Sequence, residues 1–176
     1  MTKFNHVMLK LETASTEYNA GILCIAGVKF NMDATTETEE FVFYTNPATF
    51  NGLGLNVNVD TLRWVKDNRP EVWKLCRESS NDVVDTMTLF STWLSPSTVT
   101  DSEIWGNGID FVMPVLKSSF KAADIPLPYK FYNARDLRTV LSLTNTNLKE
   151  FMDDAVTTLE ICRQQVNLLK HITRRL

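Results

Sequence analysis

Lys10 and Glu12 are the first residues of this sequence whose types and spacing can do chemistry. They lie two positions apart in the segment HVMLKLET, and side chains two apart on a strand point to the same face. A lysine that is buried without a partner is costly, so we expect Lys10 to form an ion pair with Glu12 or with Asp154. The ammonium group then acts as a fixed positive charge with three hydrogen-bond donors.

Two arginines form a second group of residues that could bind a ligand. Arg135 and Arg138 flank Asp136, and guanidinium groups bind phosphate well. An aspartate between two arginines more often builds a structural ion-pair network, and both interpretations stay open. Trp64 and Trp73 are interpreted as packing residues, although either would stack on nucleobases if it were exposed.

Composition excludes several classes of protein. The 176 residues carry a formal net charge of −3, which argues against a broad basic surface for nucleic acid. Three scattered cysteines and two histidines argue against a zinc site or a disulfide framework and favour a reduced, cytoplasmic compartment. No apolar run is long enough to span a bilayer, so we expect no membrane partner. We expect one domain over residues 1–176.

Hydrophobic periodicity indicates the elements that position these residues. Strands are predicted at 6–11, 21–30, Glu39–Tyr44, 103–105 and 130–133. Helices are predicted from Asp60 to about 69, from Pro70 onward, over 83–94, 111–123 and 136–144, and as one long helix over 148–172. Strands first, and then strands and helices in alternation, predict an α/β fold with a mixed sheet flanked by helices.

Four short segments occur in an order that is typical of one enzyme family. They are MLKLET at 8–13, WGNGIDF at 105–111, NARDLRT at 133–139 and DDA at 153–155. Together they resemble the DEDDh 3′–5′ exonucleases, and in particular the small 3′–5′ exoribonucleases of mycobacteria and phages. The segment DTLRW at 60–64 is similar to the same subfamily. The resemblance covers nearly the whole chain and implies a ribonuclease-H-like, three-layer α/β/α fold.

The resemblance also implies a particular catalytic centre. In the family, four carboxylates hold two Mg²⁺ ions, which stabilise the attacking and leaving oxygens of a phosphodiester. An Asp-x-Glu pair on the first strand, an aspartate that follows a phenylalanine after the WGNG turn, and an aspartate on the last helix supply these carboxylates. A histidine five residues before the last aspartate acts as general base.

This sequence departs from the family pattern at three of those five positions. Lys10 stands in place of the first aspartate, Val112 in place of the aspartate after the WGNG turn, and Lys149 in place of the histidine. Glu12 and Asp154 are retained. Two carboxylates and two ammonium groups give a neutral site without any metal, and Lys10 would repel a cation. We therefore expect neither a metal nor another cofactor.

The leading hypothesis is a catalytically degenerate exonuclease-like protein. It would bind a protein partner or a single-stranded nucleic acid in the cytoplasm, or in the host cytoplasm if a phage encodes it. Asn107, Arg135 and Arg138 are its candidate binding residues. One alternative is an active Mg²⁺- or Mn²⁺-dependent 3′–5′ exonuclease on RNA or DNA, in which Asp110 and Asp153 replace the lost ligands. Another is a homodimeric interaction protein whose cleft is unused.

Overall fold

A mixed five-stranded sheet forms the centre of the protein. The computed structural model describes residues 4–33, 38–94, 102–152, 154 and 157–174. The strand order is β3-β2-β1-β4-β5, with β1 antiparallel to β2 and parallel to β4. The strands are β1 (His6–Thr13), β2 (Ile22–Phe30), β3 (Glu39–Tyr44), β4 (Glu103–Gly106) and β5 (Ala134–Asp136).

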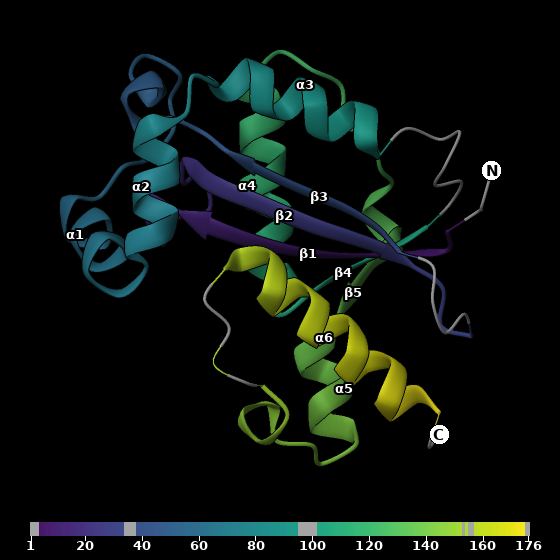
Figure 1. Ribbon diagram of the computed structural model, residues 1–176. Coiled ribbons are helices and arrows are strands. Elements are labelled where there is room, and N and C mark those ends of the chain that lie inside the picture. The colour runs from purple at the N-terminus through teal and green to yellow at the C-terminus, as the bar shows by residue number, and fades with distance from the viewer. Residues whose placement is uncertain (1–3, 34–37, 95–101, 153, 155–156, 175–176) are drawn as a thin grey trace.

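Helices cover both faces of this sheet (Figure 1). The elements α2, α3 and α4 lie on one side, and α5 and α6 lie on the other. The α-helices are α1 (Val59–Asn68), α2 (Pro70–Glu78), α3 (Val83–Trp93), α4 (Ile109–Ala122), α5 (Leu137–Leu143) and α6 (Thr158–Thr173). Short 3₁₀ helices are η1 (Pro47–Phe50), η2 (Phe131–Asn133) and η3 (Leu148–Glu150). The predicted α/β fold with three layers is confirmed.

The alternation of side chains along β1 decides which residues face which helical layer. Val7, Leu9 and Leu11 belong to the core beneath α2, α3 and α4. Met8 belongs to the second core, beneath α5 and α6. Because strand side chains alternate with a period of two, Lys10 and Glu12 follow Met8 onto the α6 side of the sheet. None of the helices in the described ranges is long and apolar enough to cross a membrane.

The continuous helix predicted over 148–172 is wrong. The apolar spacing does recur along this segment, but two separate helix starts interrupt it. The side chain of Asn147 accepts a hydrogen bond from the backbone at the start of η3. Thr157 and Glu160 then form a capping box, in which each side chain accepts a hydrogen bond from the other's backbone N–H, and α6 begins after it. The last motif of the family therefore precedes α6 in this chain.

Two shorter elements also differ from their predictions. Residues 130–133 do not form a strand, because η2 occupies Phe131–Asn133 and β5 begins at Ala134. Helix α1 begins at Val59, one residue before the predicted start at Asp60, because the side chain of Asn58 caps it by accepting the backbone N–H groups of Asp60 and Thr61. Neither difference changes the order of the elements.

A charged and aromatic cluster lies at the end of the sheet where β1 begins. The indole N–H of Trp105 donates to Nδ1 of His6 over 3.2 Å, while Oε2 of Glu103 lies 3.4 Å from the same nitrogen. Neutral His6 accepts from Trp105, whereas a protonated ring would have to turn its N–H toward Glu103. Burial lowers the pKa of His6 below 6.5, and the positive charge of Arg135 lowers this pKa further. The carboxylates of Glu103 and Asp33 raise it, but burial outweighs them.

The lowered pKa of His6 predicts how the free energy of unfolding depends on pH. The unfolded chain takes up a proton at His6 near pH 6.5, before the folded protein does, so the unfolded state binds more protons in that window. We expect the melting temperature to fall as the pH is lowered from about 8 to about 5. In His6→Gln, which keeps a polar side chain but cannot titrate, this part of the pH profile should flatten. An unchanged profile in the variant would contradict the assignment.

Candidate functional site

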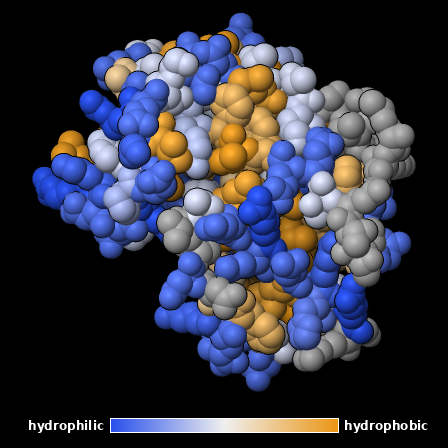
Figure 2. Space-filling view, viewed as in Figure 1, coloured by the Kyte–Doolittle hydropathy of each residue, from blue (hydrophilic) through white to orange (hydrophobic). Residues whose placement is uncertain are grey.

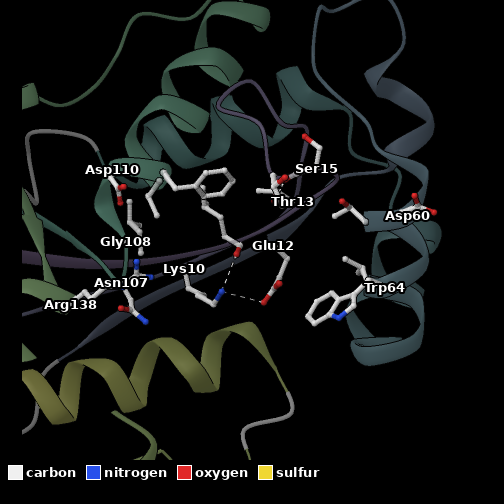
Figure 3. Close-up of a pocket in the computed structure, with 17 residues that line it drawn as sticks. Lys10, Glu12, Thr13, Ser15, Asp60, Trp64, Asn107, Gly108, Asp110 and Arg138 are labelled. Carbon is white, nitrogen blue, oxygen red and sulfur yellow. Dashed lines mark hydrogen bonds and ion pairs between the residues drawn. The ribbon is translucent and has the colours of Figure 1, made fainter. Parts of the chain in front are cut away.

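A cavity of about 690 Å³ lies at the end of β1, between α1 and the start of α4. Figure 3 shows Lys10 and Glu12 in the middle, Trp64 and Asp60 on one side, and Asn107, Gly108, Asp110 and Arg138 on the other. Four elements thus supply the site: β1, α1, the turn before α4 with α4 itself, and α5. The polar and aromatic side chains that line the cavity include those of Lys10, Glu12, Trp64, Asn107, Asp110 and Arg138.

The ion pair expected for Lys10 forms with Glu12. Nζ of Lys10 lies 3.7 Å from Oε1 of Glu12 and donates a hydrogen bond of 3.2 Å to the carbonyl oxygen of Leu11. The Glu12 side chain is only 10% exposed, and that of Lys10 is 30% exposed. At 3.7 Å the pair is an ionic contact without a short hydrogen bond. Oε1 of Glu12 is therefore a buried carboxylate oxygen without a hydrogen-bond partner in the described structure.

The turn before α4 is held by Asp136. Oδ1 of Asp136 accepts the backbone N–H groups of Gly108 and Ile109 over 2.9 and 3.1 Å, and Oδ2 accepts the N–H and the hydroxyl of Thr139 over 2.9 Å each. Burial by itself would raise the pKa of Asp136, but these hydrogen bonds outweigh it and hold the pKa below its usual value. One carboxylate thus joins the starts of α4 and α5.

Gly108 brings Arg138 to the cavity. Its φ of +90° lies in the left-handed region, which favours glycine. A Cβ atom at Gly108 would lie 3.1 Å from a guanidinium nitrogen of Arg138, so the guanidinium group packs against the bare backbone. Arg138 makes no hydrogen bond or ion pair with the residues that the structure describes. Its charge remains available to a ligand.

The wall formed by α4 is apolar at the position where the resemblance implies an aspartate. Val112 is buried, lines the cavity and packs against Gly106, where a Cβ atom would come within 3.3 Å of the Val112 side chain. Asp110, the candidate replacement ligand, is exposed in the first turn of α4 and also lines the cavity. The cavity thus has one acidic group at the edge of this wall and a hydrocarbon surface behind it.

Trp64 lies on the opposite wall and is 54% exposed. The interpretation of Trp64 as a packing residue is therefore wrong, because α1 buries only Val65 and turns the neighbouring indole into the cavity. The same interpretation of Trp73 is confirmed, since Trp73 packs against the main core. The polar residues on both sides of Trp64 in DTLRWVKD were the available sequence signal, because they leave α1 only a narrow apolar stripe to bury.

The cavity does not contain every residue that the motifs indicated. Lys149 is exposed on η3, and Asp154 is exposed before α6; neither lines the cavity. Arg135 lies at the other end of the sheet, where its guanidinium group bonds Glu103 at 2.8 and 3.0 Å. Asp153 lies outside the described residues. The predicted site is therefore divided, with Lys10, Glu12, Asn107, Asp110, Val112 and Arg138 around the cavity.

The described residues do not fit the two-metal centre that the resemblance implies. Mg²⁺ requires several oxygen ligands in octahedral geometry. In the described part of the chain, no three side chains of the His, Cys, Asp and Glu types lie close enough to share a metal ion. At the position of the first ligand there is an ammonium group 3.7 Å from Glu12. We derive no catalytic step through a metal.

Solved structures with a similar arrangement of elements include those of exonuclease I. Exonuclease I of E. coli, in a complex with single-stranded DNA, matches with a TM-score of 0.70 and 14% identity over 99% of this chain and 41% of that one. Exonuclease I of Methylocaldum szegediense matches with a TM-score of 0.71 and 14% identity over 96% of this chain and 40% of that one. The class is thus the exonuclease fold, and this chain spans about two fifths of the length of exonuclease I.

The family follows from the sequence itself. Residues 5–173 match the model of the 3′–5′ exoribonuclease Rv2179c-like domain, and the chain belongs to this family. No curated protein sequence matches it. The family, the fold and the cavity at the end of β1 together define a 3′–5′ exonuclease-like protein.

Proposed function

We propose that this protein is a catalytically degenerate exonuclease that binds single-stranded nucleic acid in its cavity and leaves it intact, without a metal ion. The observation that carries the proposal is the Lys10–Glu12 ion pair at the centre of the cavity. The family uses a pair of carboxylates there, and this chain uses one carboxylate with its counter-charge already in place.

The charge of Lys10 opposes metal binding directly. An ammonium group and a divalent cation about 4 Å apart repel each other by roughly 8 kcal/mol at an effective dielectric constant near 20. Solvent at the part-exposed Lys10 reduces this energy without changing its sign. With Val112 in the place of the next ligand, the carboxylate on that wall is the exposed Asp110 at its edge, and the buried position beside it is apolar.

The cavity retains groups that suit a nucleotide. The exposed indole of Trp64 offers a face for a base, and base stacking on an aromatic side chain is tolerant of sequence. Arg138 offers a guanidinium group to a phosphate on the opposite side. The Glu12 carboxylate, whose Oε1 faces Lys10, lines the cavity and can accept a hydrogen bond from a sugar hydroxyl. Structures of E. coli exonuclease I with single-stranded DNA share this fold.

Binding and cleavage of the same oligonucleotide test the proposal. We expect a fluorescent single-stranded RNA or DNA oligonucleotide to bind with an affinity that EDTA leaves unchanged. We also expect its length to stay constant in Mg²⁺ or Mn²⁺. Metal-dependent shortening from the 3′ end that Glu12→Gln abolishes would overturn the proposal and establish an active exonuclease.

A variant of Trp64 tests where the ligand lies. Trp64→Ala removes the stacking face, and we expect about tenfold weaker binding of the oligonucleotide. Phe131→Ala is the matched control, because Phe131 is another highly exposed aromatic residue and does not line the cavity. Equal effects of the two substitutions would show that the cavity is not the binding site.

A further inference from the structure

The outer edge of β3 has hydrogen-bonding groups available for another strand. In the described part of the chain, β3 pairs only with β2. The N–H of Thr45, the residue after β3, donates to the carbonyl oxygen of Leu23 in β2, and outward and inward groups alternate along an antiparallel strand. The backbone groups of Tyr44 and Val42 therefore point away from β2. Within the described residues, those of Val42 have no partner.

The far end of this edge is already closed. The carbonyl oxygen of Tyr44 accepts hydrogen bonds from the side chains of Ser79, over 2.7 Å, and Asn81, over 3.3 Å. An added strand must therefore end beside Val42 and Phe43. The closed carbonyl of Tyr44 therefore fixes the position along β3 at which an added strand must end.

A groove of about 310 Å³ lies beside this open edge. Val42, Phe43, Tyr44 and Leu75 form its apolar lining, and Glu78 is its charged residue. Figure 2 shows apolar side chains gathered on this face of the molecule, between the α3 and α6 layers. An extended segment that pairs with Val42 can place a side chain in the groove, as in the addition of a peptide strand to a sheet edge.

The charges around the edge indicate which occupant fits. Glu40 is held by Arg163 through two hydrogen bonds of 2.7 Å, which keep the pKa of Glu40 below its usual value. Glu78 is exposed and makes no ion pair with the described residues. Glu39 is likewise compensated, because Nζ of Lys29 donates to its Oε1 over 2.7 Å. Glu78 is thus the carboxylate beside this edge without a described counter-charge, and it favours a partner segment with a cation at this position.

We propose that the β3 edge binds an extended segment of a partner protein, with alternating apolar side chains and a lysine or arginine beside Glu78. The segment adds a sixth strand to the sheet through the backbone of Val42. Its cation faces Glu78, and one apolar side chain enters the groove. This surface is separate from the cavity and does not depend on the proposed nucleic-acid binding.

A synthetic peptide tests the surface on the full chain. The probe is acetyl-Lys-Val-Thr-Val-Thr-Val-amide with a fluorescent label, and the control peptide has glutamate in place of lysine. We expect saturable binding by fluorescence anisotropy, with the amide NMR shifts of Val42, Phe43 and Leu75 changing most. The glutamate peptide should bind about three- to fivefold more weakly.

A charge reversal provides the matched variant. Glu78→Lys lies on an exposed side chain and leaves the core intact, so we expect it to bind the glutamate peptide better than the lysine peptide. Equal affinities of the native protein for both peptides would overturn the proposal. So would amide shifts centred away from β3, or a concentration-dependent dimer that covers Val42.

Discussion

The double variant Lys10→Asp, Val112→Asp is expected to bind Mn²⁺ with a stoichiometry that calorimetry can measure. It places two new carboxylates beside Glu12 at the positions where the resemblance implies metal ligands, and it removes the ammonium group. Without metal, we expect a loss of about 3 kcal/mol in the free energy of unfolding, because an aspartate replaces the buried Val112.

The metal should restore this stability. At about 100 times its dissociation constant, a ligand that binds only the folded state adds about 2.7 kcal/mol, which corresponds to a rise of about 5–10 °C in the melting temperature of a chain of this size. Adding Glu12→Gln to the double variant should abolish the rise. A folded double variant without any response to Mn²⁺ would show that the cavity differs from the family site in shape as well as in charge.

Lys149→His does not belong in this experiment. The sequence placed Lys149 at the position of the general base, but the structure places it on η3, exposed and outside the cavity. A histidine there has no described carboxylate of the cavity beside it. We therefore expect metal binding in the double variant without a corresponding gain in cleavage.

Asp136→Ala is expected to have the largest effect on the stability of the native cavity. The substitution removes all four hydrogen bonds that the carboxylate accepts from Gly108, Ile109 and Thr139. Two helix starts lose their cap, and we expect a loss of about 2 kcal/mol after allowing for the half-exposed position of the side chain. Chemical denaturation measures the loss. Binding of the oligonucleotide should weaken as well, because Asn107 and Arg138 lie on the two segments that Asp136 joins.

The matched control is Asp82→Ala, which removes the cap of α3 alone. We expect it to cost about 1 kcal/mol and to leave oligonucleotide binding unchanged. The pH dependence of stability also distinguishes Asp136→Ala from Asp82→Ala.

The pKa of Asp136 is depressed in the folded state, so the stabilisation that its carboxylate provides is present above about pH 4 and disappears as the pH falls through the folded-state pKa. Asp136→Ala should reduce this acid-dependent loss of stability; an equal loss in variant and native protein would contradict the role.

Local periodicity in the sequence was sufficient for most of the sheet and for the first half of the site. A period of two predicted that Lys10 and Glu12 share a face. The expense of burying an isolated ammonium group predicted an ion pair of Lys10 with Glu12 or Asp154, and the structure selected Glu12. The WGNG turn was readable because Gly108 adopts a backbone conformation that few other residues accept. These features depend on residues that are close together in the chain.

The second half of the site depended on contacts between distant residues. The apolar spacing over 148–172 is compatible with one long helix, and only the caps at Asn147 and Thr157 separate η3 from α6. Arg135 was indistinguishable from Arg138 as a phosphate ligand until the sheet placed Glu103 beside it.

The sequence by itself determined the family and the order of most strands and helices along the chain, and it placed Lys10 and Val112 where the resemblance implies metal ligands. Only the tertiary structure decided that Trp64 faces the cavity, that Asp136 joins α4 to α5, and that Lys149 lies elsewhere. The physical reason is the separation along the chain of the residues that interact. Periodicity and charge compensation act between neighbours in the chain, whereas burial and hydrogen bonding at the cavity depend on segments about 30 to 120 residues apart that meet only when the sheet has formed.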